Sequence, residues 1–216
     1  MVDFHTHILP GIDDGSKTPQ ESITLLQEEA RQGIQTVCLT PHYYAGEMAP
    51  SEFLIRRDRS WRTLKKHWCS GLPDIRLGAE VQYFDGIAQV PEIMQLRIEG
   101  TAYLLMEMPF CQWTDRMLKE VLDLQNRDNL CVVLAHIERY LEKNEATVWR
   151  ELLAHGVLMQ SNVSFFYRWR TKYRAISMLK RGQIHFLGSD CHNMTYRCPN
   201  WDRLSPKVLN TYRTDF

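Results

Sequence analysis

The sequence predicts an α/β fold, a distorted parallel βα barrel of about seven units with functional residues at the C-terminal ends of its strands. Short, largely apolar runs are each followed by polar or turn residues, which is typical of strands buried on both faces of a parallel sheet. Longer segments with helical periodicity separate these runs. About seven such units in a chain of 216 residues favour a closed or nearly closed barrel, and a doubly wound open sheet is the alternative.

The expected strands are a few residues long and follow one another at intervals that leave room for a helix. They are Val2–His7, Thr36–Thr40, Ile75–Val81, Ala102–Glu107, Leu130–Ala135, Leu158–Asn162 and His185–Ser189. Connections between strands and helices are short, except for the stretch between residues 82 and 100.

The clearest expected helix runs from Pro19 to Gln32. Thr18 and Glu21 form a capping box, Pro19 occupies the first helical position, and Gly33 supplies the stop signal. Further helices are expected at Glu52–Trp68, Asp115–Asn126, Glu145–His155 and Arg170–Lys180.

The chain is expected to form one domain over residues 1–216, with residues 199–216 as a loosely attached tail. It has 26 basic and 26 acidic residues, a balance that argues against nucleic acid as a partner. The longest apolar runs, such as Cys131–Ala135, are far too short for membrane insertion. The N-terminus lacks the features of a signal peptide, so a cytoplasmic location is expected. Formation of a homo-oligomer is compatible with the sequence.

Metal-ligand residue types recur at the C-terminal ends of the expected strands. His5 and His7 end the first strand as an H-x-H pair, and strand alternation lets both imidazoles reach one metal. The others are His42, Glu80, Glu107, His136, Asp190 and His192. A lone His or Glu at such a position is more often a surface or capping residue. Because active sites of parallel barrels gather at this edge, the whole set predicts a metal centre.

The composition of this set indicates the chemistry. Oxygen and nitrogen ligands without thiolates suit Mn²⁺, Fe²⁺ or Zn²⁺. The ligands are too many for one ion, which predicts a carboxylate-bridged cluster. Such a cluster generates hydroxide near neutral pH and clamps the attacking and leaving oxygens of a phosphoester. The residues therefore predict a phosphoester hydrolase.

Several motifs carry a family resemblance. They are Asp3–Ser16 (D-F-H-T-H-I-L-P-G-I-D-D-G-S), Thr40–His42, Gly78–Glu80, Glu107, His136–Tyr140 (H-I-E-R-Y) and Ser189–Asn193 (S-D-C-H-N). With them the sequence resembles, from Met1 to about Pro199, the polymerase and histidinol phosphatase (PHP) superfamily. Within it the sequence is similar to the bacterial manganese-dependent tyrosine-protein phosphatases of capsule and exopolysaccharide operons.

The resemblance implies a PHP-type barrel with about three divalent ions. One ion is expected on His5, His7, Glu80 and Asp190; Glu80 bridges to a second, held also by Glu107 and His136; Asp14, His42 and His192 hold a third. The expected catalytic residues are Arg139 and Arg197, which match phosphate-contacting positions, and His42. The implied substrate is a phosphotyrosine cluster on a bacterial tyrosine autokinase that controls polysaccharide export.

Some of these residues could have a purely structural role instead. Asp13 and Asp14 could be turn residues before the capping box. Arg139 could form a surface ion pair with Glu138 or Glu142. The aromatic and basic stretch from Phe165 to Arg174 favours an amphipathic helix with a solvated basic face, or else it borders the mouth of the site.

A rival mechanism rests on Cys191 and Arg197, whose C-x5-R spacing marks cysteine-dependent tyrosine phosphatases. That loop needs glycines to wrap the phosphate, and this segment has none. Alternation also points Cys191 away from the neighbouring ligands. None of the six cysteines is expected in a structural disulfide. The remaining alternatives are a small-molecule phosphatase such as histidinol phosphatase, a nuclease-like phosphoesterase, and a non-catalytic regulatory PHP module.

Overall fold

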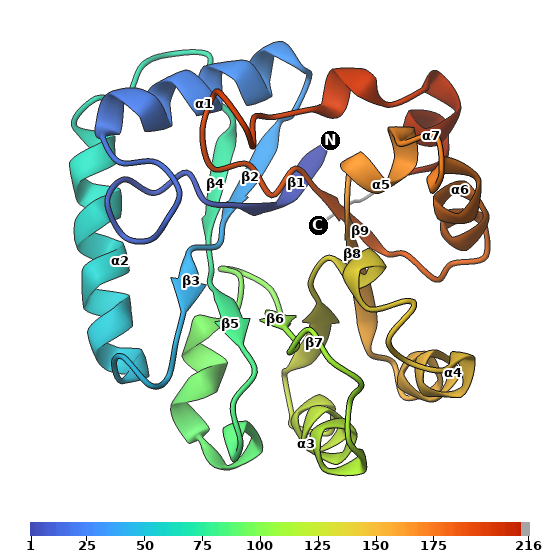
Figure 1. Cartoon of the computed structure of the whole chain (residues 1–216). Coiled ribbons are helices and arrows are strands. Elements are labelled where there is room, and N and C mark those ends of the chain that lie inside the picture. The colour runs from blue at the N-terminus through green and yellow to red at the C-terminus, as the bar shows by residue number, and fades with distance from the viewer. Residues whose placement is uncertain (213–216) are drawn as a thin grey trace.

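Parallel strands form the centre of the protein, and helices surround them (Figure 1). The computed structural model describes residues 1–212. One ladder has the order β1-β2-β4 and the other the order β3-β5-β6-β7-β8-β9, and every pair is parallel. The strands are β1 (Val2–Thr6), β2 (Thr36–Leu39), β3 (His42–Tyr43), β4 (Asp74–Leu77), β5 (Glu80–Gln82), β6 (Tyr103–Glu107), β7 (Cys131–Leu134), β8 (Leu158–Asn162) and β9 (Phe186–Gly188). The predicted α/β class with parallel strands is confirmed, and the strands form a curled sheet.

The two ladders are linked by backbone hydrogen bonds between β9 and β1, and on the other side by the chain itself, which runs from β2 into β3 and from β4 into β5. Between β9 and β1, the Asp190 N–H donates to the His5 carbonyl at 2.9 Å, and the His7 N–H donates to the Cys191 carbonyl at 2.9 Å. The Glu80 N–H donates to the Pro41 carbonyl at 3.0 Å where the pairing of β3 with β5 begins. The first and last strands of the chain therefore lie side by side.

One expected strand is interrupted, and a short strand, β3, follows the expected strand Thr36–Thr40 without having been predicted. Pro41 has no N–H to contribute to a ladder, and the chain passes there from β2 to β3. The expected strand Ile75–Val81 divides at Gly78 into β4 and β5, where a Cβ atom would lie 3.0 Å from the Ile98 side chain. Both breaks shift the chain just before His42 and Glu80, two of the predicted ligands.

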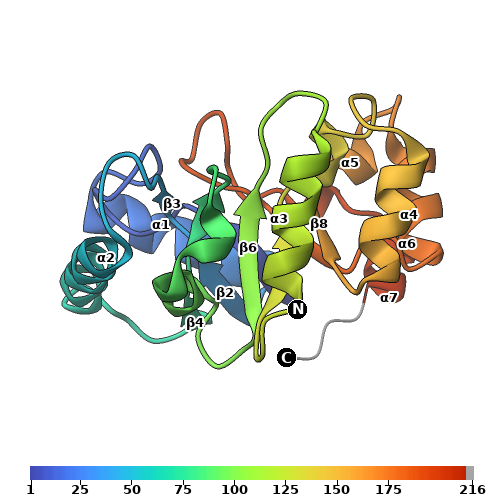
Figure 2. The same cartoon turned by 90° about the horizontal axis from the view of Figure 1, so that it is seen from below.

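Helices cover the outside of the sheet; Figure 2 shows α3 beside the upright β6, with α4 farther to the right. They are α1 (Pro19–Arg31), α2 (Pro50–Lys65), α3 (Asp115–Gln125), α4 (Ala146–Ala154), α5 (Ser164–Tyr167), α6 (Lys172–Lys180) and α7 (Pro206–Thr211), with 3₁₀ turns at Ile87–Gln89, Pro91–Leu96, Ile137–Arg139 and Trp201–Arg203. The Thr18 hydroxyl accepts from the Glu21 N–H at 3.2 Å, as the capping box predicts. The five predicted helices are all present, with ends shifted by a few residues.

The expected loose tail begins at residue 199. Within its described part, Trp201 is 1% exposed and its indole N–H donates to Asp3 Oδ2 at 2.9 Å. The Leu187 N–H donates to the Tyr212 hydroxyl at 3.0 Å. Residues 199–212 therefore pack against the body of the protein, while residues 213–216 of the expected tail lie outside the described residues.

A small apolar cluster holds β1 against β9. The rings of Phe4 and Phe186 stack with centroids 4.0 Å apart, and Tyr103 meets both. The register between β1 and β2 shifts between Asp3 and Thr6, which marks a bulge just before the H-x-H pair. No helix in residues 1–212 combines the length and the apolar character needed to cross a bilayer.

Candidate metal centre

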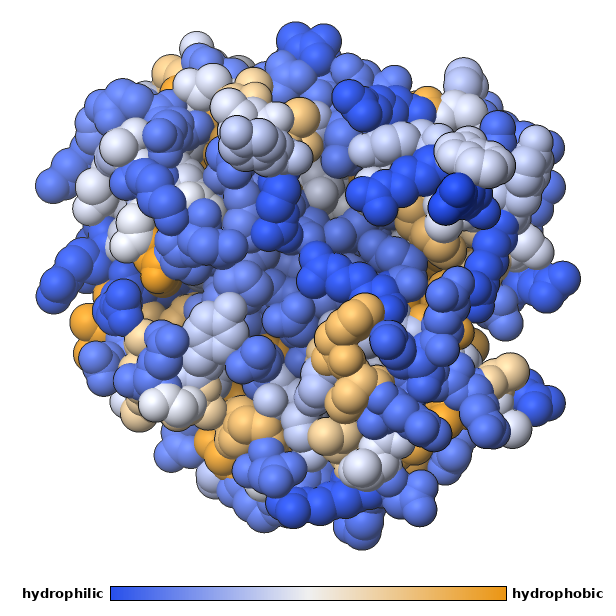
Figure 3. All heavy atoms as spheres, in the orientation of Figure 1, coloured by the Kyte–Doolittle hydropathy of each residue, from blue (hydrophilic) through white to orange (hydrophobic). Residues whose placement is uncertain are grey.

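The structure brings the nine predicted ligands together at the C-terminal ends of the strands. Eight of them lie within or just after β1, β3, β5, β6, β7 and β9, and Asp14 comes from the loop after β1. The nine are His5, His7, Asp14, His42, Glu80, Glu107, His136, Asp190 and His192. Figure 3, in the orientation of Figure 1, shows a mostly hydrophilic surface around the middle of this face.

Glu80 occupies the middle of this cluster and is 1% exposed. Its Oε2 lies 3.1 Å from His5 Nε2, 3.2 Å from His7 Nε2 and 3.0 Å from His42 Nδ1. Its Oε1 lies 2.9 Å from His136 Nε2. One carboxylate thus faces four imidazoles from three strand ends, which is the arrangement that a bridging ligand requires.

Three overlapping groups of these side chains have the spacing of a metal site, with donor atoms within 4.8 Å of one another. They are His5 with His7 and Asp190; His42 with Glu80 and Glu107; and His7 with Asp14, His42 and His192. Each group offers only nitrogen and carboxylate oxygen, which suits Mn²⁺, Fe²⁺ or Zn²⁺. His7 and His42 each belong to two groups.

Three buried polar atoms at the centre lie close to other ligand atoms, but none of them has a partner with hydrogen-bond geometry: Glu80 Oε2, His42 Nδ1 and His192 Nε2. A buried polar atom left unsatisfied costs about 1–3 kcal/mol. Their orientation toward one another is explained if cations bind between them, so the residues present fit divalent metal ions.

Protons on the histidines offset the carboxylates in this structure. Burial disfavours charge on Glu80, yet the neighbouring His5 and His136 hold the pKa of its carboxyl well below the usual range. Burial likewise opposes protonation of His7, but its hydrogen bonds to Asp13 and Glu80 raise its pKa to about 10. Divalent ions would take the place of these protons, so metal binding is expected to release protons.

Two predicted ligands sit on strained backbone. His136 has φ of +32° and Asp190 has φ of +55°, in the region that non-glycine residues rarely adopt. Such backbone strain costs about 1–3 kcal/mol per residue and is found mainly at functional sites, where the surrounding structure holds the residue in place. Close approach is also required at Gly188, where a Cβ atom would lie 2.6 Å from His5 Cβ.

Three supporting residues were not predicted. Asp13 Oδ2 accepts from His7 Nδ1 at 2.8 Å, so it orients a ligand rather than only forming a turn. On β8, Gln160 Oε1 lies 3.3 Å from His5 Nδ1, and Asn162 Nδ2 donates to Asp190 Oδ2 at 2.9 Å. Asn162 ends a correctly predicted strand, and that position was the available signal for it, whereas Gln160 lies in the middle of the strand and offered none.

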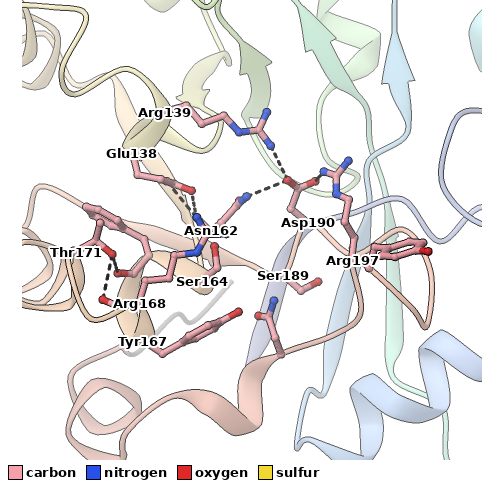
Figure 4. Close-up of a pocket in the computed structure, with 13 residues that line it drawn as sticks. Glu138, Arg139, Asn162, Ser164, Tyr167, Arg168, Thr171, Ser189, Asp190 and Arg197 are labelled. Carbon is pink, nitrogen blue, oxygen red and sulfur yellow. Dashed lines mark hydrogen bonds and ion pairs between the residues drawn. The ribbon is translucent and has the colours of Figure 1, made fainter.

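The two predicted phosphate-binding arginines converge on Asp190 (Figure 4). Arg139 lies 2.9 Å from Asp190 Oδ2 and 3.3 Å from Glu107 Oε1, and Arg197 lies 2.5 Å from Asp190 Oδ1. The alternative role for Arg139, a surface ion pair with Glu138 or Glu142, does not occur among residues 1–212. Both arginines remain 38% exposed, so they border the site and are open to a ligand.

Cys191 does not face the cluster. It is fully buried, and its Sγ lies 3.7 Å from Glu29 Oε1 on α1. Burial and the nearby Glu29 and Asp3 carboxylates raise the pKa of the thiol well above its usual value. Cys191 is therefore a poor nucleophile, as the sequence predicts. All six cysteines are free.

A pocket of about 380 Å³ opens beside the arginines (Figure 4). Asp190, Arg139 and Arg197 form one side of it. The other side includes Phe165, Tyr167, Arg168 and Thr171, from the aromatic and basic stretch. These four residues lie at the mouth of the site, which is the second of the two interpretations of that stretch.

A family model described as capsular polysaccharide synthesis, CpsB/CapC, matches residues 1–215. The chain belongs to the CpsB/CapC family. The tyrosine-protein phosphatase CpsB of Streptococcus pneumoniae is 34% identical over 226 residues, covering 98% of this chain and 91% of that protein. The family resemblance inferred from the sequence motifs is thereby confirmed.

Solved structures agree with this assignment. The chain superposes with a TM-score of 0.75 and 26% identity on a structure from the pair YwqE of Bacillus subtilis and CpsB of S. pneumoniae, described as metal-dependent tyrosine phosphatases. That match covers 94% of this chain and 84% of the other. A histidinol phosphatase HisK structure from Listeria monocytogenes has a TM-score of 0.57 at 16% identity, over 89% of this chain and 95% of the other, and shares the fold.

Proposed function

We propose that this protein is a metal-dependent tyrosine-protein phosphatase that hydrolyses phosphotyrosine on a bacterial tyrosine kinase governing capsule or exopolysaccharide synthesis. The observation that carries the proposal is the buried Glu80 carboxylate facing four imidazoles beside two partly exposed arginines. Membership of the CpsB/CapC family and the similarity to CpsB and YwqE support the substrate class.

The nine clustered side chains would hold about three ions, Mn²⁺ in the first place, with Fe²⁺ or Zn²⁺ as alternatives. Asp190 joins His5 and His7, Glu107 and His136 flank Glu80, and Asp14 joins His42 and His192. When bound, such ions activate water and neutralise charge on a phosphoryl group. Gln160 and Asp13 would hold the imidazoles in place through their outer nitrogens.

The substrate phosphate would bind between Arg139 and Arg197. Each guanidinium carries several N–H donors in a plane and can hold two phosphate oxygens. Both now pair with Asp190, which keeps them at the edge of the cluster. They would orient the phosphoryl group and stabilise the charge that builds on it during transfer. His42, 14% exposed and stacked beside Tyr44, would face the leaving phenolic oxygen.

The domain organisation and the cellular location are part of the same proposal. A single domain built as a seven-unit barrel is supported by the hydrogen bonds that join β9 to β1. A cytoplasmic location also belongs to the proposal.

The test compares two substrates under identical conditions. Purified protein loaded with Mn²⁺ should release phosphate from a phosphotyrosine peptide far faster than from histidinol phosphate. EDTA should abolish this activity, whereas the Cys191→Ser variant should retain most of it. Faster turnover of histidinol phosphate would contradict the proposed substrate class. Loss of activity in Cys191→Ser with metals still bound would restore the cysteine mechanism.

A further inference from the structure

The pocket beside Asp190 extends beyond what the phosphoryl group needs. Arg139, Asp190 and Arg197 line the part next to the metal-binding residues, so a group in the pocket adjoins the predicted phosphate position. The part away from them is lined by side chains of α5 and of the loop after it. The pocket is therefore a second binding region that is continuous with the first.

Arg168 places an unpaired positive charge on this pocket. Arg139 and Arg197 both pair with Asp190, but within residues 1–212 no ion pair forms at Arg168. The Glu138 carboxylate also lines the pocket, yet it accepts from the Ser161 hydroxyl and the Asn162 N–H instead. Figure 4 shows the Arg168 side chain reaching into the pocket from the end of α5.

A second lining residue supplies an unpaired acceptor. Asn200 Oδ1 is buried and has no hydrogen-bond partner. An amide oxygen in this position needs an N–H or O–H donor from a ligand. A peptide bearing an anionic side chain meets both demands, because its backbone donates an N–H and its side chain accepts from a guanidinium.

We propose that this pocket binds the residue next to the phosphotyrosine of a protein substrate, and that Arg168 selects an anionic side chain there. The inference rests on the proposed tyrosine-phosphatase function. A carboxylate and the phosphate of a second phosphotyrosine share the chemistry that a guanidinium recognises. Phe165 and Tyr167 supply apolar walls for the rest of that residue.

Binding of peptides that cannot be hydrolysed tests the preference directly. The probes contain a phosphonate analogue of phosphotyrosine flanked by alanine, glutamate, lysine or phosphotyrosine, and calorimetry gives their Kd for the Mn²⁺-loaded protein. A charge-assisted contact at a partly exposed site predicts about fivefold to tenfold tighter binding of the glutamate peptide than of the alanine peptide. A stronger preference for phosphotyrosine than for glutamate identifies doubly phosphorylated segments as the ligand, and the reverse identifies acidic segments.

Substitutions assign the preference to Arg168. In Arg168→Gln the glutamate and alanine peptides should bind about equally. In Arg168→Glu the lysine peptide should bind more tightly than the glutamate peptide, a reversal that misfolding cannot produce. The matched control is Arg170→Gln: Arg170 is also exposed, lies over the Trp169 ring at 5.0 Å, and does not line the pocket. That variant should keep the full preference.

Two results would overturn the inference: equal binding of all the peptides by the unmodified protein, or an undiminished preference in Arg168→Gln. Hydrolysis of ordinary phosphotyrosine peptides is measured in parallel. Turnover without a flank preference defeats only the role of Arg168, whereas no turnover of any phosphotyrosine peptide defeats the proposed function itself.

Discussion

Glu80 is the residue on which the centre depends most. Its two oxygens lie within 3.2 Å of imidazole nitrogens from His5, His7, His42 and His136. A substitution there therefore removes a ligand from two predicted ions and a neighbour of His42 at the third, whereas loss of a peripheral ligand such as Asp14, which is 62% exposed, disturbs one.

Glu80→Gln is expected to lower kcat/KM on a phosphotyrosine peptide by about 10³-fold or more, because the amide keeps the volume but removes the bridging charge. The fold should persist, since the core around it is unchanged. Steady-state kinetics measure the loss, and circular dichroism checks the fold. The control is Glu142→Gln, an exposed residue, which should behave like the unmodified enzyme. Activity within about threefold of normal in Glu80→Gln would exclude Glu80 from the site.

Residue-scale prediction from the sequence succeeded where a side chain follows a strand. The positions of His136 and Asp190 required only the order of strands, because parallel strands end at one edge. The role of Gln160 could not be predicted, since its contact with His5 depends on how the curled sheet brings β8 close to β1. Asp13 was read as a turn residue because its reach back to His7 depends on the loop conformation.

At the scale of the elements, the pairing of β1 with β9 positions the site. Gly188 ends β9 where the backbones approach most closely, and a Cβ atom there would lie 2.6 Å from His5 Cβ and 2.9 Å from Gln160 Nε2. A methyl group at this point must push β9 away from β1, and with it the adjacent Asp190.

Gly188→Ala is therefore expected to destabilise the protein by about 1–3 kcal/mol, through overpacking of a buried contact. It should also weaken metal binding, because the predicted ligands shift apart. Denaturant unfolding and metal titration measure the two effects. Gly46→Ala serves as the control, since its added Cβ has no atom within 4 Å. Equal stability of the two variants would show that β9 can move without cost.

The boundaries of some strands and helices could be predicted more accurately than those of others. The capping box and the proline located α1 closely, because both signals are local. The division of the expected strand 75–81 was not predictable, since it follows from the close approach of Ile98 to Gly78. The basic stretch after β8 split into α5 and α6 because Phe165 and Phe166 turn into the core. Tertiary packing decided these boundaries.

On the scale of the whole molecule, a buried carboxyl pair couples α1 to the sheet. Glu29 is fully buried, with its Oε1 3.3 Å from the Ser189 hydroxyl. Burial, together with the nearby Asp3 carboxylate, raises the pKa of Glu29 well above its usual value. The folded state therefore holds a proton that the unfolded chain releases at lower pH.

The free energy of unfolding is expected to fall as pH rises above the ordinary range of a glutamate, about 4.5, toward the raised pKa, because the folded state binds more protons there. The slope from this group is at most about 1.4 kcal/mol per pH unit. Urea unfolding of EDTA-treated protein across that range measures it. Glu29→Gln should flatten the dependence; an unchanged slope would mean that Glu29 ionises freely in the folded protein.

Metal binding should also stabilise the whole fold, because the clustered ligands come from six strands and from the loop after β1. The unfolded chain scatters these ligands, so ions bind the folded state preferentially. At a hundredfold excess over Kd, each ion adds about 2.7 kcal/mol, which corresponds to a rise in Tm of roughly 5–10 °C for a chain of this size. Elemental analysis at saturation should return more than one Mn²⁺ per chain, and Glu80→Gln should lose most of the rise in Tm. One ion or none at saturation, together with full activity, would contradict a cluster and reduce the site to a single metal.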